Sequence, residues 1–242
     1  MAEMLRILRP VVDLHAAPRR DGMRVTQALW GEAAEILHSH EGWAHVRLQA
    51  DGYEGFMEEE ALGPAPAPTH RLMVPSAHVY PQPDIKSAPA FEAYLGCGLA
   101  VAGVEGNFLR LAQGGFLAAA VMDAKPADPA AMAAQFLHVP YLWGGKTARG
   151  LDCSGLVQIA LAACAISAPR DSGPQQQQLG RPVAQAEALQ RNDLVFWKGH
   201  VGMLTAPDRL LHANAHHMQV VEEDLALAIA RIGKPAAIKR LQ

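Results

Sequence analysis

Residues 150–157 read Gly150-Leu151-Asp152-Cys153-Ser154-Gly155-Leu156-Val157. A glycine turn leads here into an apolar run, residues 154–165, which predicts a buried helix. Cys153 would then lie at the helix N-terminus, where the helix dipole favours a thiolate over a thiol. The unpaired backbone N–H groups of the first turn could also hold an oxyanion during acyl transfer. We therefore predict that Cys153 is a nucleophile, in preference to a small buried hydrophobe.

The other two cysteines lack such surroundings. Cys164 lies within an apolar run, residues 161–166, and Cys97 lies between two glycines, so both are predicted to belong to a core or a turn. Three cysteines form an odd and sparse set, which argues against a disulfide framework. Residues 1–10 also lack the unbroken apolar stretch of a secretory signal. We therefore expect free thiols and a cytoplasmic protein.

A thiol nucleophile needs a base, and His200 is the predicted one. His200 opens an apolar predicted strand, residues 201–205, and has a glycine on each side in the chain segment 199–202. His212 lies on the next predicted strand. If the hairpin loop has three residues, even-numbered positions of both strands share a face, and the two histidines are diagonal neighbours. His212 is therefore predicted to orient His200.

Two proline-rich segments, residues 63–68 and 125–129, predict linkers. They divide the chain into three parts, residues 1–66, 67–125 and 126–242. The first two parts share an order of short strand, loop, glycine turn, alternating strand and a second turn that ends in Gly-aromatic. This order predicts two small all-β barrels, which resemble bacterial SH3-like domains. The third part places a helix before short antiparallel strands, an α+β layout.

Four motifs follow one another in the third part, namely residues 140–145 (PYLWGG), 151–155 (LDCSG), 192–197 (NDLVFW) and 199–202 (GHVG). With these motifs the third part resembles the NlpC/p60 family of cell-wall cysteine peptidases. The resemblance implies a papain-like catalytic domain in which Cys153 is the nucleophile, His200 the base and His212 the orienting group. It further implies that Tyr141 lies beside the thiol and helps to hold the oxyanion. Asp152 and Ser154 would help to hold the amino end of the substrate.

Two SH3-like domains before such a domain resemble the subset that cleaves γ-D-glutamyl-diaminopimelate bonds. The resemblance implies that the first barrel lines the cleft and recognises a free N-terminal L-alanine, whereas the second barrel is structural. Tyr53, in the turn 52–56, is then the expected cleft tyrosine, and Glu32 could supply a carboxylate for the ammonium group. The expected partner is a murein peptide, with diaminopimelate or L-lysine after D-glutamate, in cell-wall recycling. Residues 170–172 could line the same cleft, without an assigned role.

Composition and motifs argue against several other functions. The formal net charge is −3 and 19% of residues are charged, which gives no reason to expect nucleic acid or a membrane as partner. Gly145-Lys146-Thr147 lacks the earlier glycine of a phosphate-binding loop. His212 and His216 have the spacing of a helical zinc motif, but Ala213 replaces its glutamate. We therefore expect no metal and no cofactor.

Two alternatives to a peptidase stay open. An amidase or acyltransferase on the same fold would use the same groups, because a thiolate and an oxyanion hole serve any acyl transfer. The third part could also be inactive, which would leave a peptidoglycan-binding module. The joint presence of Cys153, His200 and His212 argues against the binding module.

Overall fold

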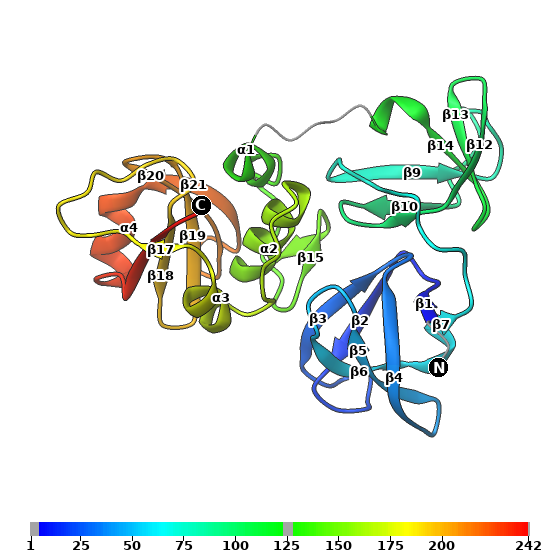
Figure 1. Ribbon diagram of the computed structural model, residues 1–242, viewed down its shortest axis with the longest axis horizontal. Coiled ribbons are helices and arrows are strands. Elements are labelled where there is room, and N and C mark those ends of the chain that lie inside the picture. Colours follow the sequence, from blue (N-terminus) through cyan, green and yellow to red (C-terminus); the bar gives the residue numbers. More distant parts are fainter. Residues whose placement is uncertain (1–4, 123–127, 242) are drawn as a thin grey trace. The chain divides into compact units, whose positions relative to one another are not determined.

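The computed structural model describes residues 5–122 and 128–241, which fold as two compact units, Met1–Lys125 and Pro126–Gln242 (Figure 1). The first two predicted parts of the chain therefore lie in one compact unit. Residues 125–127 of the predicted second linker are outside the described residues. None of the helices within the described ranges has the length and apolar character of a membrane span.

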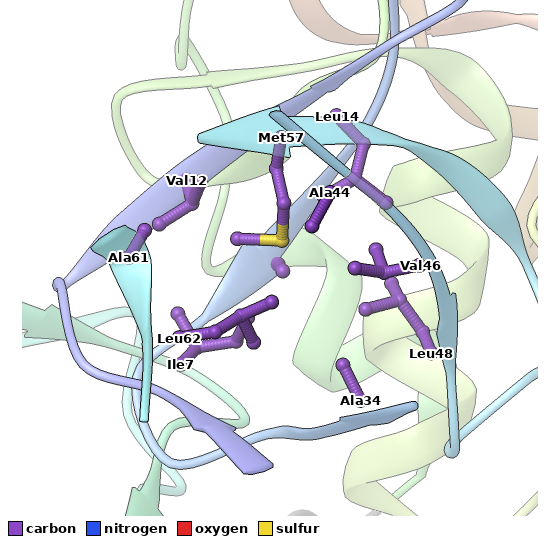
Figure 2. Close-up of a cluster of buried hydrophobic side chains, with 11 residues drawn as sticks. Ile7, Val12, Leu14, Ala34, Ala44, Val46, Leu48, Met57, Ala61 and Leu62 are labelled. Atoms are coloured by element: carbon purple, nitrogen blue, oxygen red, sulfur yellow. The ribbon is translucent and has the colours of Figure 1, made fainter. Parts of the chain in front are cut away.

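The first barrel is an antiparallel seven-stranded sheet in the order β3-β2-β6-β5-β4-β1-β7. Its core follows from alternation: in β5, every second residue is buried, as expected for a strand with one face toward a core. Figure 2 shows the side chain of Met57 pointing into the middle of the core cluster. The strands are β1 (Leu5–Ile7), β2 (Val11–His15), β3 (Arg24–Leu29), β4 (Ala33–His40), β5 (Trp43–Leu48), β6 (Glu54–Glu58) and β7 (Leu62–Gly63), with a 3-10 turn η1 (Glu59–Ala61) before β7.

The second barrel has a five-stranded antiparallel sheet, β10-β9-β14-β13-β12, and a separate pair, β11-β8. Leu72, Val79, Leu99 and Leu117 are fully buried in it. Its elements are β8 (His70–Arg71), β9 (Ser76–Tyr80), β10 (Phe91–Tyr94), β11 (Gly98–Leu99), β12 (Val101–Glu105), β13 (Phe108–Leu111), β14 (Phe116–Ala118) and the 3-10 turn η2 (Ala119–Met122).

The two barrels meet at a pair of glycines. The Gly98 N–H donates to the Trp30 carbonyl at 2.7 Å, and the Trp30 ring packs edge-on against Phe91 with centroids 4.9 Å apart. Gly31 has φ +77°, and a Cβ at this position would lie 2.4 Å from the Gly98 carbonyl oxygen. Only glycine permits so close a backbone approach, so this contact joins both barrels into one unit.

The second unit contains an antiparallel six-stranded sheet, β17-β22-β18-β19-β20-β21, with helices packed on it. Helices α1 and α2 pack against each other and against β19 and β20, while α4 packs on Leu204 and Leu210. The elements are α1 (Pro129–Ala134), β15 (Lys146–Thr147), β16 (Gly150–Leu151), α2 (Cys153–Ala163), α3 (Ser172–Gln178), β17 (Arg181–Pro182), β18 (Leu194–Trp197), β19 (His200–Ala206), β20 (Arg209–Asn214), β21 (Gln219–Asp224), α4 (Leu225–Ile232) and β22 (Ala237–Arg240).

The predicted fold class, α+β after an all-β N-terminal region, is confirmed. The apolar run 154–165 is helical from Cys153 to Ala163, and residues 153–161 are all buried because this helix packs inside the domain. The first helix of this unit, α1, is short and ends at Ala134. His138 has φ +68°, a conformation that an α-helix does not contain.

Candidate active site

Cys153 is the first residue of α2, as predicted, and Asp152 caps this helix. The Asp152 carboxylate accepts a hydrogen bond from the Gly155 N–H at 2.7 Å, which satisfies a donor of the first turn. A Cβ at Gly155 would lie 2.3 Å from the Gly145 carbonyl oxygen. Gly155 therefore lets the loop before β15 lie directly against the start of the helix, next to the thiol.

Arg170 holds this helix start in place. Its guanidinium, almost fully buried, donates to both carboxylate oxygens of Asp152, at 2.9 and 2.7 Å, and to Ser154 Oγ at 3.0 Å. A buried charge is tolerated when it is paired and hydrogen-bonded in this way, and losing one partner of such a pair typically costs about 3–5 kcal/mol. The sequence left residues 170–172 without a role, so Arg170 is an addition from the structure.

Further contacts hold the Asp152 carboxylate in place. Besides Arg170 and Gly155, it accepts from the Gly144 N–H at 2.9 Å and from the Ser154 hydroxyl at 3.4 Å. Asp152 is therefore a helix cap and the partner of Arg170. Ser154 Oγ lies in the same network, where it also accepts from Arg170.

The thiol itself is buried and protonated at neutral pH. Burial, aided by the negative charge of Asp152, raises the pKa of Cys153 to about 11, although the backbone N–H groups of Val201 and Ser154 hydrogen-bond the sulfur and act in the opposite direction. The Ser154 N–H at the helix N-terminus does favour a thiolate, as expected. Burial in the first place, and the Asp152 carboxylate in the second, outweigh this contribution in the free protein.

The hydrogen bond from Val201 to the thiol also locates the first histidine. Val201 follows His200 at the start of β19, so His200 lies beside the end of α2 that carries Cys153. His200 Nε2 lies 2.8 Å from His212 Nδ1. The other ring nitrogen of His200, Nδ1, is thereby left for the thiol. Burial, with His212 nearby, lowers the pKa of His200 to about 4, so this imidazole is neutral at pH 7.

The two histidines are diagonal neighbours, as the sequence predicted, but for a partly different reason. The loop between β19 and β20 has two residues, not three, and a bulge between Leu204 and Ala206 shifts the register by one. Met203 consequently pairs with Leu211. The bulge replaces the missing loop residue, which keeps His200 and His212 on one face of the sheet.

The neutral thiol and neutral imidazole lead to a prediction on pH. Because a raised pKa keeps Cys153 protonated until the pH approaches about 11, alkylation of Cys153 by iodoacetamide should accelerate continuously from pH 6 to pH 10. The rate is measured by peptide mapping in a protein with Cys97→Ala and Cys164→Ala. A rate that is already constant between pH 6 and pH 9 would show a preformed thiolate–imidazolium pair and contradict this assignment.

Tyr141 lies close to the thiol. It forms a bridge to Leu151 in parallel orientation and is half-buried. Burial, with the nearby Cys153 and Asp152, raises the pKa of Tyr141 to about 12. Its hydroxyl therefore stays protonated and can donate a hydrogen bond to an oxygen that becomes negative beside Cys153.

The two site residues expected from the first barrel lie in the other compact unit. Glu32 stands at the turn between β3 and β4, where its carboxylate accepts from the Leu29 N–H at 2.9 Å. It borders a pocket of about 380 Å³ that Arg6 and Arg71 also line. Tyr53 directly precedes β6 and is partly exposed.

Two residues of the site were missed from the sequence, Glu223 and Arg231. His212 Nε2 lies 2.7 Å from Glu223 Oε1, and Arg231 of α4 forms an ion pair with the same carboxylate. The two imidazoles and the Glu223 carboxylate therefore form a connected series within the second unit, and the Cys153 thiol lies near its His200 end through the Val201 N–H. Cys97 is fully buried in the second barrel, and Cys164 is the partly exposed C-cap of α2, so neither lies near a histidine of this series.

Comparison with known families matches two segments of the chain. Residues 138–230 match the NlpC/P60 family, and residues 14–62 match the domain described as the bacterial dipeptidyl-peptidase SH3 domain. The first range contains Cys153, His200, His212 and Glu223, and the second contains Glu32 and Tyr53.

Similar proteins of full length agree with this assignment. A γ-D-glutamyl-L-lysine dipeptidyl-peptidase from Bacillus cereus is 26% identical, over 78% of this chain and 66% of its own length. Dipeptidyl-peptidase 6 from Lysinibacillus sphaericus is 25% identical, over 94% of this chain and 97% of its own. A crystal structure of an NlpC/P60 family protein from Bacillus cereus superimposes with a TM-score of 0.82 at 22% identity, over 99% of both chains. Residues 138–230 therefore form a peptidase domain of the NlpC/P60 type, which follows a bacterial SH3 domain at residues 14–62.

Proposed function

We propose that the protein hydrolyses the bond between the γ-carboxyl group of D-glutamate and a diamino acid, diaminopimelate or L-lysine, in murein-derived peptides with a free N-terminal L-alanine. The observation that carries this proposal is the His200–His212 pair, whose neighbour Val201 hydrogen-bonds the Cys153 thiol, in a chain whose relatives are named dipeptidyl-peptidases. A dipeptidyl-peptidase releases two residues from the amino end, which fits an L-Ala-D-Glu product.

The proposed reaction begins with a neutral thiol. As the Cys153 sulfur attacks the γ-carbonyl carbon, its proton passes to Nδ1 of His200. The Tyr141 hydroxyl and the first backbone N–H groups of α2 stabilise the resulting oxyanion. The C–N bond then breaks, and the diamino acid leaves with the proton from His200. Water hydrolyses the thioester with His200 as base, which releases L-Ala-D-Glu and restores the thiol.

Recognition of the free amino end is assigned to the first barrel. Asp152, held by protein donors beside the thiol, is one proposed carboxylate for the ammonium group. Glu32 and Tyr53 are the groups proposed from the first barrel: a second carboxylate for the ammonium group and an aromatic ring to cover it. Ser154 is the proposed contact from the second unit. The SH3 match over residues 14–62, a domain described by its occurrence in dipeptidyl-peptidases, supports this assignment.

The proposed substrate also indicates a role and a location in the cell. Peptides with a free N-terminal L-alanine have already been detached from glycan, so the enzyme would serve cell-wall recycling in the cytoplasm. The three cysteines form no disulfide, which supports this location because thiols persist in a reducing compartment.

A comparison of free and N-acetylated L-Ala-γ-D-Glu-diaminopimelate tests the substrate. Acetylation removes the ammonium charge and with it a charge-assisted hydrogen bond, so kcat/KM should fall by about 100-fold or more. Products are identified by mass spectrometry, and the L-lysine peptide is assayed in parallel. Glu32→Gln should lose most of this preference, whereas Glu35→Gln, on the neighbouring strand, should keep it. Equal kcat/KM values for the free and acetylated peptides would remove the ammonium site from the proposal.

A further inference from the structure

The carboxylate of Glu223 lies behind His212, on the side of the imidazole that faces away from His200. His212 is fully buried, with Nδ1 toward His200 at 2.8 Å and Nε2 toward Glu223 Oε1 at 2.7 Å. In the β20–β21 ladder Glu223 lies opposite Leu210 and His212 lies opposite Val221, so Glu223 is the diagonal neighbour of His212 on the same face. The pairing of β19, β20 and β21 therefore places both His200 and Glu223 beside His212.

The carboxylate is itself held firmly. Arg231, in the last turn of α4, donates to both oxygens of Glu223, with 2.9 Å from Nη1 to Oε2. This ion pair, together with the hydrogen bond from His212, lowers the pKa of Glu223 to about 2. Glu223 is thus ionised at any pH at which the enzyme would work, and an ionised carboxylate can only accept hydrogen bonds.

These contacts determine where the protons lie. Because Glu223 can only accept, His212 Nε2 carries the hydrogen and His212 Nδ1 carries a lone pair. His200 Nε2 must then donate to that lone pair, which leaves His200 Nδ1 without a proton. Asn214 Nδ2 lies 3.1 Å from His212 Nε2, but its amide is oriented by Oδ1, which accepts from the His217 N–H at 2.8 Å. Asn214 Nδ2 is itself a hydrogen-bond donor and cannot accept the hydrogen on His212 Nε2. The Glu223 carboxylate is therefore the acceptor of that hydrogen.

We propose that Glu223, held by Arg231, is a positioning residue that sets the tautomers of His212 and His200 and so presents an unprotonated Nδ1 to Cys153. The inference rests on the proposed function for its catalytic consequence. Glu223 touches neither substrate nor thiol and acts through two imidazoles. When His200 takes the thiol proton, the positive charge can be shared with His212 and stabilised by the carboxylate behind it.

The tautomers can be observed in the unmodified full-length protein. Histidine ring ¹⁵N spectra at pH 7 report which nitrogen carries hydrogen, with signals assigned from His200→Gln and His212→Gln. The expected result is an Nε2–H tautomer for both histidines. An Nδ1–H tautomer for His212 would overturn the inference, whatever the activity of any variant.

Glu223→Gln tests the consequence, and Glu222→Gln is the matched control. Glu222 lies on the same strand, on its opposite face, and its carboxylate pairs with Arg209 and Thr205 in place of a histidine. For Glu223→Gln, kcat should fall by about 100-fold with KM within about threefold, and alkylation of Cys153 at pH 7 should slow. Glu222→Gln should stay within about twofold of the unmodified protein in each measurement. A Glu223→Gln protein with unmodified kcat and alkylation rate would overturn the inference.

The two readouts separate this inference from the proposed function. Alkylation needs no knowledge of the substrate. If the unmodified protein fails to cleave the murein peptides but Glu223→Gln still slows alkylation, the substrate proposal is wrong and the positioning role stands. If the unmodified protein cleaves them and Glu223→Gln equals it in both assays, the substrate proposal stands and the positioning role is overturned.

Discussion

Replacing Cys153 with alanine should reduce kcat by at least about 10⁴-fold, because loss of a nucleophile removes the covalent route entirely. The fold should persist: the side chain is small, alanine is a good helix former, and the cap from Asp152 does not depend on the sulfur. The measurement is kcat on L-Ala-γ-D-Glu-diaminopimelate, together with thermal unfolding to show that Tm is close to that of the unmodified protein.

The other cysteines supply the controls for this experiment. Cys164→Ala changes a partly exposed helix C-cap and should leave kcat unchanged. Cys97→Ala removes a fully buried sulfur that accepts from the Tyr94 N–H, so it should lower Tm modestly and still leave kcat unchanged. Retained activity in Cys153→Ala, or its loss in Cys164→Ala, would remove Cys153 from the role of nucleophile.

Replacing His200 with alanine should reduce kcat by about 10³- to 10⁴-fold, because a thiol with a pKa near 11 cannot attack without a base at neutral pH. His212→Ala should cost less, on the order of 10²-fold, since it orients the base and does not itself accept the thiol proton. Rates are measured at pH 7 by single turnover, which separates chemistry from product release.

His216→Ala is the matched control for both histidine variants. His216 is exposed, and its ring packs edge-on against His217. It should therefore turn over at the unmodified rate. If His200→Ala retained a rate within tenfold of the unmodified protein, another group would have to be the base.

Local sequence patterns were sufficient for the helix and for its thiol. A glycine turn followed by an apolar run predicted both the start of α2 and the position of Cys153, because these features lie within a few consecutive residues. The net pKa of the thiol could not be predicted, since it depends on burial and on the Asp152 carboxylate in three dimensions. Likewise, Arg170 is 18 residues from Asp152 and reaches it only because the loop after α2 folds back toward the start of that helix.

The register between neighbouring β-strands could be predicted only in part from the sequence. His200 and His212 were paired correctly, although the assumed three-residue loop is in fact a two-residue loop with a bulge. Glu223 was not found because Glu222 and Glu223 are adjacent acidic residues, and strand register decides which of them faces His212. A shift of one residue exchanges the faces of a strand, and the sequence 215–218 does not define the length of that hairpin loop uniquely.

The most direct test of Cys153 as the acylated nucleophile is to trap the acyl-enzyme. A γ-p-nitrophenyl ester of L-Ala-D-Glu acylates faster than the peptide because of its better leaving group, so the thioester should accumulate. The predicted result is a burst of p-nitrophenolate equal to the enzyme concentration, with the L-Ala-D-Glu acyl mass found, after acid quenching and peptide mapping, on the peptide that contains Cys153. An acyl group mapped to Cys164 or to any other residue, or turnover without a burst and without a covalent species, would contradict it.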